Sequence, residues 1–388
     1  MDFELTDEQE EIRKQVRALC SRFPDEYWRE RDETGEFPWE FYKAIADGGW
    51  LGITIPKEYG GAGLGITEAA LVMQTVAECG GGTQACSAVH LGIFGLEPLI
   101  KYGTQEAKDK YLAPILSGEL HVSFAVTEPD AGTNTTQIST MATRSGDGYL
   151  INGQKVFITK AQESKKMLIL TRTTPFEEVS KKTMGMSLFF ADIDPAAVEV
   201  KELHKMGRKA VDTNMLFIDD LYVAKEDLIG EEGRGFYYIL DGINPERILI
   251  AAECIGMGKR AVEKAVKYAK EREVFGRPIG KNQGIQFPLA ESFAKLETAE
   301  LMVQKAAYLY DAGKPCGKES NISKYMAAEA ACEAADRAIQ THGGYGYIKE
   351  YDVERYWREA RLFRIAPISQ EMVLNYVGEH VLELPKSY

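Results

Sequence analysis

The spacing of hydrophobic residues changes twice along this chain of 388 residues, and that change most restricts how the chain can fold. Residues 1–119 and 229–388 carry apolar residues every three or four positions, which is typical of amphipathic helices. Residues 120–228 instead form short runs rich in Val, Ile, Phe and Thr, most of them bounded by turn residues, which indicates β-strands. We therefore predict an α+β protein with three domains at these limits: helical, β and again helical.

Three local signals make the prediction more specific. Thr6 is followed three residues later by Gln9, which is the pattern of a helix capping box. Asn152-Gly153 within "GYLINGQKVFIT" resembles the turn of a β-hairpin. Pro245 and Glu246 precede a long apolar helical pattern, and a proline followed by a carboxylate is typical of a helix start.

The composition excludes several classes of protein. A formal net charge of −13 and a pI near 5.1 make a nucleic-acid-binding protein improbable. Six cysteines without CxxC spacing are expected to be small core residues in a reducing compartment, so we predict neither a disulfide framework nor a metal site. We see no secretion signal and no membrane span, and we expect a cytoplasmic protein.

Four segments carry residues suited to a cofactor. "FAVTEPDAGTNTTQ" (124–137) ends a predicted strand in a loop crowded with hydroxyl groups, and "FIT" (157–159) places an aromatic ring beside a hydroxyl donor. "EREVFGRPIGKNQGIQ" (271–286) and "QTHGGYGY" (340–347) combine Arg272 with a glycine-rich helix end, which suits a pyrophosphate. The alternatives are ordinary strand ends, an Arg–carboxylate pair and a glycine that ends a helix.

Taken in order, these segments make the chain resemble the acyl-CoA dehydrogenase family of flavoproteins from end to end. "PKEYGGAGLG", "KMGRKAVDT" and "YWREARLFRI" belong to the same ordered set. The resemblance implies that the middle domain is β-barrel-like and that the C-terminal domain is a four-helix bundle. It also implies that FAD binds between these two domains.

The resemblance assigns cofactor-binding roles to residues in both of these domains: Phe124, Val126, Thr127, Thr133, Phe157, Ile158, Thr159, Arg272, Phe275, Gln283, Gln340, Gly343, Gly344, Ser369 and Glu371. Thr127 and Thr159 would hydrogen-bond the isoalloxazine ring. The residues of this set from Arg272 to Gly344 would meet the dinucleotide part across a subunit interface. Thr133 and Arg247 match substrate-binding positions near CoA, and His90 lies on a helix that lines the far end of the acyl pocket.

The catalytic base is the main departure from the family pattern. Aligned on "RLFRIAPISQEM", the usual glutamate position holds Pro367, or Ala366 after a shift of one residue. Isovaleryl- and long-chain acyl-CoA dehydrogenases instead place the base directly before the arginine that matches Arg247, and this chain has Glu246 there. A carboxylate in a dry pocket has a raised pKa and is a competent base. We therefore favour Glu246 as the catalytic residue over a helix cap.

The function that the resemblance implies is α,β-dehydrogenation of an acyl-CoA to a trans-2-enoyl-CoA. Electrons would pass to electron-transfer flavoprotein, and the enzyme would be a homo-oligomer, most commonly a tetramer in this family. The alternatives are an oxygen-using flavin oxidase or monooxygenase on the same fold, or a non-catalytic flavin- or CoA-binding scaffold. His90 hints at a polar, acidic or aromatic acyl group, and a hydrogen-bonded core histidine is the other interpretation. The absence of a carboxylate at Pro367 predicts activity with branched or ring-bearing acyl groups.

Overall fold

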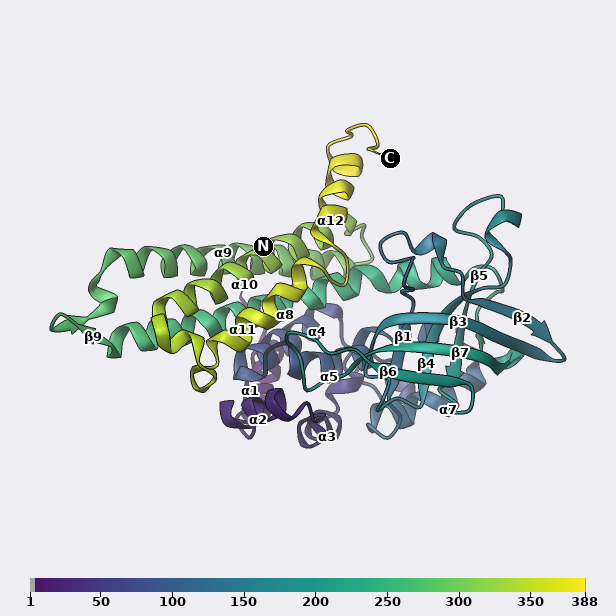
Figure 1. Ribbon diagram of the computed structural model, residues 1–388, viewed down its shortest axis with the longest axis horizontal. Helices are drawn as coiled ribbons and strands as arrows, with labels where there is room; N and C mark the ends of the chain where they lie inside the picture. Colours follow the sequence, from purple (N-terminus) through teal and green to yellow (C-terminus); the bar gives the residue numbers. More distant parts are fainter. Residues whose placement is uncertain (1–3, 388) are drawn as a thin grey trace.

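The structure is a computed structural model and describes residues 4–387. An N-terminal group of helices, a β-sheet and a C-terminal helical bundle follow one another along the chain, as the hydrophobic spacing predicts. The sheet lies at one end of an elongated molecule, and the bundle extends from it to the other end (Figure 1). The domain limits at 119/120 and 228/229 stay predictions.

Seven helices form the N-terminal part: α1 (Asp7–Cys20), α2 (Asp25–Thr34), α3 (Trp39–Asp47), α4 (Ile66–Val76), α5 (Gly82–Phe94), α6 (Glu97–Tyr102) and α7 (Gln105–Leu116). The predicted capping box is confirmed. The Thr6 hydroxyl accepts from the Gln9 backbone N–H at 3.2 Å, and the Gln9 side chain accepts from the Thr6 N–H at 3.1 Å. Two otherwise unpaired backbone donors at the start of α1 are thereby satisfied.

The middle part is a single sheet in hydrogen-bonded order β6-β7-β3-β2-β4-β5-β8, with β1 parallel to β4. Its strands are β1 (Val122–Ala125), β2 (Met141–Ser145), β3 (Gly148–Thr159), β4 (Lys166–Arg172), β5 (Met186–Asp192), β6 (Val198–Glu202), β7 (Thr213–Ala224) and β8 (Leu228–Ile229). Buried side chains from β1 to β7 meet in one core, so the sheet curves around its own interior.

The predicted hairpin turn at Asn152-Gly153 is wrong. These residues lie inside β3, and the turn between β2 and β3 falls at 146–147 instead. Gly153 occupies a bulge where the register against β7 shifts, and its φ of +152° is a conformation that a side chain disfavours. The Asn152 side chain bonds across to Asp220 on β7 at 2.9 Å. A glycine that permits a bulge has the same local sequence signature as one that permits a turn.

The C-terminal part consists of three long helices and two short ones: α8 (Gly235–Glu271), α9 (Gln283–Asp311), α10 (Gly317–His342), α11 (Val353–Ala360) and α12 (Gln370–Tyr376). Helices α8 to α11 pack as the bundle, and α12 projects from it (Figure 1). A short hairpin, β9 (Glu273–Val274) and β10 (Arg277–Pro278), joins α8 to α9 at the end of the bundle far from the sheet (Figure 1).

The predicted helix start at Pro245 is also wrong. Helix α8 begins at Gly235, so Pro245 and Glu246 lie inside it, almost three turns from its start. A proline in a helix removes one backbone hydrogen bond. Here the segment before Pro245 packs against α6 and β5, and this tertiary packing continues the helix through the proline. Glu246 is therefore not a helix cap.

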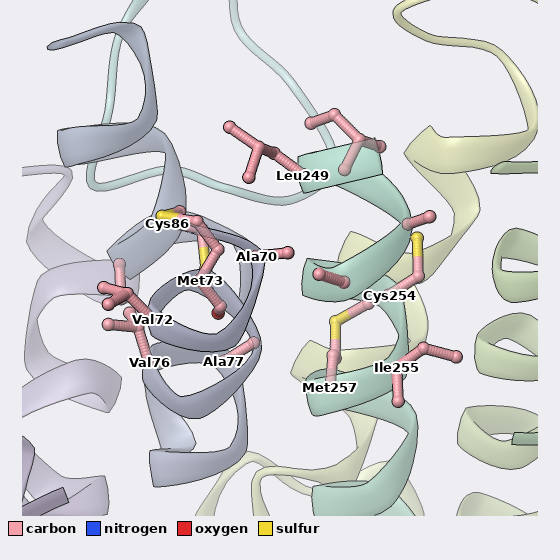
Figure 2. Packing of buried hydrophobic residues seen from close by; sticks show 14 of the residues in the cluster. Ala70, Val72, Met73, Val76, Ala77, Cys86, Leu249, Cys254, Ile255 and Met257 are labelled. Atoms are coloured by element: carbon pink, nitrogen blue, oxygen red, sulfur yellow. Dashed lines mark hydrogen bonds between the residues drawn. The ribbon is translucent and has the colours of Figure 1, made fainter. Parts of the chain in front are cut away.

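The largest core cluster joins the first and last parts of the chain. The side chains of Met73 in α4 and of Ala77, which directly follows α4, lie opposite Leu249 and Met257 of α8, with Cys86 of α5 beside them (Figure 2). All six cysteines are free, and five of them are buried. Among the helices of residues 4–387, none combines the length and the apolar character that a membrane crossing needs.

Candidate active site

The two predicted strand-end segments, 124–127 and 157–159, lie side by side. The Val156 N–H donates to the Thr127 carbonyl at 2.9 Å, and the Lys155 ammonium donates to the Val126 carbonyl at 3.0 Å. Phe157 has a left-handed φ of +61°, and 66% of its surface is exposed, so its ring is free to contact a ligand. Of the other residues, Phe124, Val126, Thr127 and Thr159 are half-buried, Ile158 is buried, and Thr133 is exposed on the following loop.

Glu128, a buried carboxylate that was not among the predicted site residues, holds this loop in place. Glu128 accepts from the Ser139 backbone N–H at 2.6 Å, from the Thr140 N–H at 3.0 Å and from the Lys155 ammonium at 2.8 Å. Burial alone would raise the pKa of Glu128, but Lys155 and these donors outweigh it and hold the pKa below its ordinary value. The loop from Glu128 to Thr140 is thus tied to β3 by charge-assisted bonds.

A second group of predicted residues meets at the opposite end of the bundle. Arg272, Gln340, Gly343 and Gly344 line one pocket of about 500 Å³, together with aromatic side chains that include Tyr345. The Arg272 guanidinium lies 5.9 Å from the centre of the Tyr345 ring. The space where Cβ atoms of Gly343 and Gly344 would lie is open, so their backbone is accessible to a ligand.

Two residues of the predicted pyrophosphate clamp do not line this pocket. Phe275 is fully exposed at the tip of the β9–β10 hairpin, in a left-handed conformation with φ of +54°. Gln283 is exposed at the first position of α9. An aromatic side chain without any cover within its own chain is available to another molecule.

The strand-end segments and the pocket are far apart in one chain. Glu246 lies within α8, and Arg272 directly follows the last residue of this helix. At a rise of about 1.5 Å per residue, the two residues are roughly 39 Å apart along the helix axis. Figure 1 shows the same separation, with the sheet at one end and the β9–β10 hairpin at the other. The two groups of predicted residues therefore lie toward opposite ends of the bundle within one chain.

Glu246 and Arg247 are both half-buried on α8. Burial raises the pKa of Glu246 to about 7; the nearby Arg247 guanidinium opposes this shift, and the Glu253 carboxylate adds to it. The pKa of Arg247 is lowered by burial, against the effect of Glu246. Glu246 is consequently a carboxylate that exchanges a proton close to neutral pH, which is what a general base requires.

A buried polar cluster lies next to this part of α8. The His90 Nδ1 lies 2.9 Å from Glu253 Oε1, and both side chains are buried. Arg208 donates to the hydroxyl groups of Ser87 at 3.2 Å, Thr159 at 3.3 Å and Thr213 at 2.9 Å. Arg208 lies within "KMGRKAVDT", a motif of the family resemblance, but it was not among the predicted site residues. Glu253 was not predicted either; its sequence signal is that it is the lone acidic residue within the apolar run "ILIAAECIGMG".

The C-terminal segment packs onto the bundle through a buried lysine. The Lys324 ammonium donates to the carbonyls of Phe363 at 2.7 Å and Ile368 at 2.6 Å. Ser369 accepts from the Met372 N–H at 3.4 Å and caps α12. Glu371 is exposed, and hydrogen bonds from its own backbone N–H and from Ser369 lower its pKa. Its carboxylate is a weaker base than Glu246.

Lys160, the residue that follows "FIT", points into the N-terminal helices. Its ammonium donates to the Ala88 carbonyl at 3.4 Å and lies 5.2 Å from the centre of the Tyr42 ring. Burial lowers the pKa of Lys160 to about 8. The residue therefore ties the end of β3 to α3 and α5.

The residues present fit a flavin dinucleotide: one end offers an exposed aromatic ring and threonine hydroxyls, and the other offers an arginine and open glycine backbone. The fold and these two groups define an FAD-dependent oxidoreductase that acts on CH–CH bonds. Three models of one family match the chain: the acyl-CoA dehydrogenase N-terminal domain over residues 6–119, middle domain over 123–221 and C-terminal domain over 233–382. The chain belongs to the acyl-CoA dehydrogenase family.

Individual relatives are similar over nearly their whole length. The chain is 37% identical to the 3-(aryl)acrylate reductase of Clostridium sporogenes, over 97% of this chain and 99% of the relative. It is 38% identical to the caffeyl-CoA reductase–Etf complex subunit CarC of Acetobacterium woodii, over 92% and 94%. The structure of butyryl-CoA dehydrogenase from Megasphaera elsdenii superposes with a TM-score of 0.93 at 30% identity, covering 98% of this chain and all of that one.

Proposed function

We propose that this protein removes the α-proton and the β-hydride of an acyl-CoA thioester to give the trans-2-enoyl-CoA, with Glu246 as the catalytic base. The proposal depends on the different pKa values and exposures of two carboxylates. Burial raises the pKa of Glu246 to about 7, whereas Glu371, the other carboxylate near the C-terminal position, is exposed with a lowered pKa. An α-C–H beside a thioester is a weak acid, so its removal needs a base of raised pKa held in a dry site.

The other residues of the site bind and orient. FAD, when bound, supplies the acceptor for the β-hydride at its N5 atom. Thr127 and Thr159 would hydrogen-bond its ring, and Phe157 would cover it, because these residues lie on the two adjoining strand-end segments. Arg247 and Thr133 contact the CoA arm. Ser369 and Glu371 contribute to flavin binding from the α12 side.

Replacing Glu246 by Gln tests the assignment. The substitution keeps the size of the side chain and removes its proton acceptor, so flavin reduction by substrate should fall by about 10²- to 10⁴-fold while FAD content and acyl-CoA binding persist. Glu263→Gln is the matched control, because Glu263 is exposed on the same helix. Anaerobic stopped-flow absorbance measures the rate. Unchanged reduction in Glu246→Gln, or loss of proton abstraction in Glu371→Gln instead, would overturn the assignment.

Assembly follows from the separation of the two groups of flavin residues. We infer a homo-oligomer in which Arg272, Gln340 and the glycines of one chain bind the dinucleotide part of an FAD whose ring lies in another chain. The exposed Phe275 supports this, because a fully solvated phenylalanine at a hairpin tip is available to a partner. A tetramer built as a dimer of dimers is the assembly that we propose.

The proposed electron partner is electron-transfer flavoprotein. One relative is named as a subunit of a complex with Etf, at 38% identity over 92% of this chain.

The competing function is an oxygen-using oxidase or monooxygenase on the same fold. Mixing the substrate-reduced enzyme with air-saturated buffer separates the two: slow reoxidation by oxygen and fast reoxidation by electron-transfer flavoprotein support the proposal, and the reverse order supports an oxidase. A non-catalytic scaffold predicts no flavin reduction by any acyl-CoA.

We propose a ring-bearing acyl group as the substrate class. Two relatives are named for aryl and caffeyl substrates. No carboxylate stands at Pro367 in the sequence, and this leaves space for a bulky β-substituent. In a panel scored by flavin reduction, 3-phenylpropionyl-CoA should match or exceed butyryl-CoA, and a strict preference for straight chains would refute this part of the proposal.

A further inference from the structure

Arg208 is a cation that hydroxyl groups hold in place without a contacting carboxylate. It lies in the loop before β7, and its Nε atom is buried. Its Nη1 donates to the Ser87 hydroxyl at 3.2 Å, and its Nη2 donates to the hydroxyls of Thr159 at 3.3 Å and Thr213 at 2.9 Å. Carboxylates influence this charge only from a distance, and no residue of 4–387 forms an ion pair with it.

This arrangement is costly, which indicates a role beyond packing. A buried charge is normally paired with an opposite charge. Burial lowers the pKa of Arg208, although distant carboxylates, Glu253 among them, oppose the shift. The backbone of Arg208 also has a left-handed φ of +56°, which is disfavoured for a residue with a side chain. Strained backbone and unpaired charges are enriched at functional sites.

The guanidinium determines which way the Thr159 hydroxyl points. A guanidinium only donates hydrogen bonds, so the Thr159 oxygen must accept from it. The single hydrogen of this hydroxyl then points away from Arg208, and it is donated to no group within residues 4–387. Thr159 ends β3, in the same strand-end segment as the exposed ring of Phe157. The hydroxyl hydrogen is therefore free for a ligand at this end of the strand.

We propose that Arg208 is a positioning residue, which fixes the Thr159 hydroxyl as a hydrogen-bond donor to the flavin ring. The inference rests on the proposed function, in which Thr159 contacts the flavin, and it adds the residue that orients this contact. A hydroxyl that accepts from a cation is also a stronger donor, because the two hydrogen bonds polarise each other. Ser87 on α5 and Thr213 on β7 hold the guanidinium from two further elements.

Such a hydrogen bond makes the redox potential of the flavin depend on Arg208. Reduction changes the electron density and the protonation of the ring atoms. One donated hydrogen bond therefore stabilises the oxidised and the reduced ring to different extents. Removing this bond, or turning its hydrogen away, should shift the midpoint potential. A residue that only supports the fold would change FAD content or stability and leave the potential of the bound flavin in place.

The test is a double-mutant cycle scored by the midpoint potential of the FAD-loaded protein. Thr159→Val removes the hydroxyl at nearly constant shape, and Arg208→Met removes the guanidinium. Each should change the ratio of reduced to oxidised flavin at a fixed potential by about 10-fold or more, about 30 mV for a two-electron couple, and in the same direction. In the Thr159→Val background, Arg208→Met should shift the potential by less than half as much as in wild type, because it acts through the hydroxyl.

Three results would overturn the proposal: an unchanged potential in Arg208→Met, a shift opposite to that of Thr159→Val, or a shift of equal size in both backgrounds. Arg144→Met removes an exposed charge from the same sheet and should keep the wild-type potential. If Arg208→Met does not retain FAD, Arg208→Gln takes its place. The amide oxygen of Gln can accept the Thr159 hydrogen and turn it away from the flavin, so the same shift and the same loss of additivity are expected.

Failure of this inference differs from failure of the proposed function, because a chemical reductant sets the potential without any acyl-CoA. If no acyl-CoA reduces the flavin but the cycle shows coupling, acyl-CoA dehydrogenation is wrong and the positioning role stands. If an acyl-CoA reduces the flavin and the two substitutions act additively, the dehydrogenation stands and the role of Arg208 is excluded.

Discussion

At the scale of single residues, the chemistry depends on where one carboxylate lies. Glu246 is held in protein surroundings that favour its neutral form, and Glu253 adds a second negative charge on the same helix face. Arg247 limits the shift, so the pKa settles near 7 and not far above it. At neutral pH a substantial fraction of Glu246 is ionised, and the ionised form is a stronger base than an exposed glutamate.

The pH dependence of the reaction follows from this pKa. As the proposed base, Glu246 would have to be deprotonated to accept the α-proton, so kcat/KM should rise with pH and reach half of its plateau near pH 7. The measurement is flavin reduction at low substrate concentration between pH 5 and 9. Glu263→Gln should keep this midpoint. A midpoint near the ordinary glutamate pKa of 4.5 would show that the surroundings of Glu246 do not raise its pKa in solution.

The same shift changes stability. The pKa of Glu246 is about 7 in the folded protein against an ordinary 4.5, so between these values the folded state binds more protons than the unfolded state. The free energy of unfolding contributed by this group therefore falls as the pH rises from about 4.5 to about 7. Gln does not ionise, so the Glu246→Gln variant does not lose this stability as the pH rises. Its free energy of unfolding at pH 8 should exceed that of the wild type by about 1–3 kcal/mol.

Urea unfolding at two pH values checks this expectation. The stability difference between Glu246→Gln and wild type should shrink when the pH is lowered from 8 to 5, because the wild-type carboxyl is then mostly protonated. A difference of equal size at both pH values would mean that packing, and not the charge, distinguishes the two proteins.

At the scale of elements, one buried ion pair joins a loop to a strand. The 128–140 loop follows β1, and Glu128 fixes it to β3 through Lys155, whose side chain is fully buried. Burial lowers the pKa of Lys155 to about 8, with Glu128 opposing the shift. Since Lys155 also donates to Val126, the pair holds the loop and the strand-end segment in one arrangement.

Lys155→Met should leave the Glu128 carboxylate buried without its cation. Breaking a buried pair from one side costs about 3–5 kcal/mol, so the free energy of unfolding should fall by that amount. FAD retention after gel filtration should also weaken, because the loop beside Thr127 loses its attachment. Arg144→Met, which removes one partner of an exposed pair with Glu232, is the control and should change stability by less than about 0.5 kcal/mol. Comparable stability losses in the two variants would contradict the role of the buried pair.

At the scale of the whole molecule, the length of α8 decides how the site is assembled. The helix has 37 residues, roughly 55 Å, and it carries Glu246 near the sheet while Arg272 follows its far end. No folding of the remaining chain can bring these two ends of a straight helix together. In the homo-oligomer that we propose, both would contribute to one FAD site.

Complementation between two inactive variants tests this arrangement. Co-expressed Glu246→Gln and Arg272→Ala chains form hybrids in which one site combines an intact Glu246 with an intact Arg272. Random pairing predicts recovery of about a quarter of wild-type activity, since half of the dimers are hybrids and each has one intact site. Each variant expressed alone should have little activity, through lost proton abstraction in one and lost FAD in the other. If the co-expressed mixture shows only the sum of the two residual activities, both groups of residues come from the same chain.

Periodicity and short motifs were sufficient to predict the helical, β and helical order and the capping box at Thr6 and Gln9. These features depend on interactions between residues a few positions apart, and such interactions can be predicted from the spacing of residue types along the sequence. Asn152-Gly153 and Pro245 were misread because the local signal is ambiguous. A glycine serves a bulge as well as a turn, and packing against other elements continues a helix through a proline.

The tertiary structure alone decided the pKa of Glu246, the pairing of His90 with Glu253, and the distance between the two groups of predicted flavin residues. Arg208 comes from the loop before β7, His90 from α5 and Glu253 from α8, so their contacts join segments far apart in the sequence. A pKa depends on the charges and the protein atoms that surround a group, and no residue spacing encodes them. The sequence names the chemical groups, and the packing of distant elements determines which of them act together.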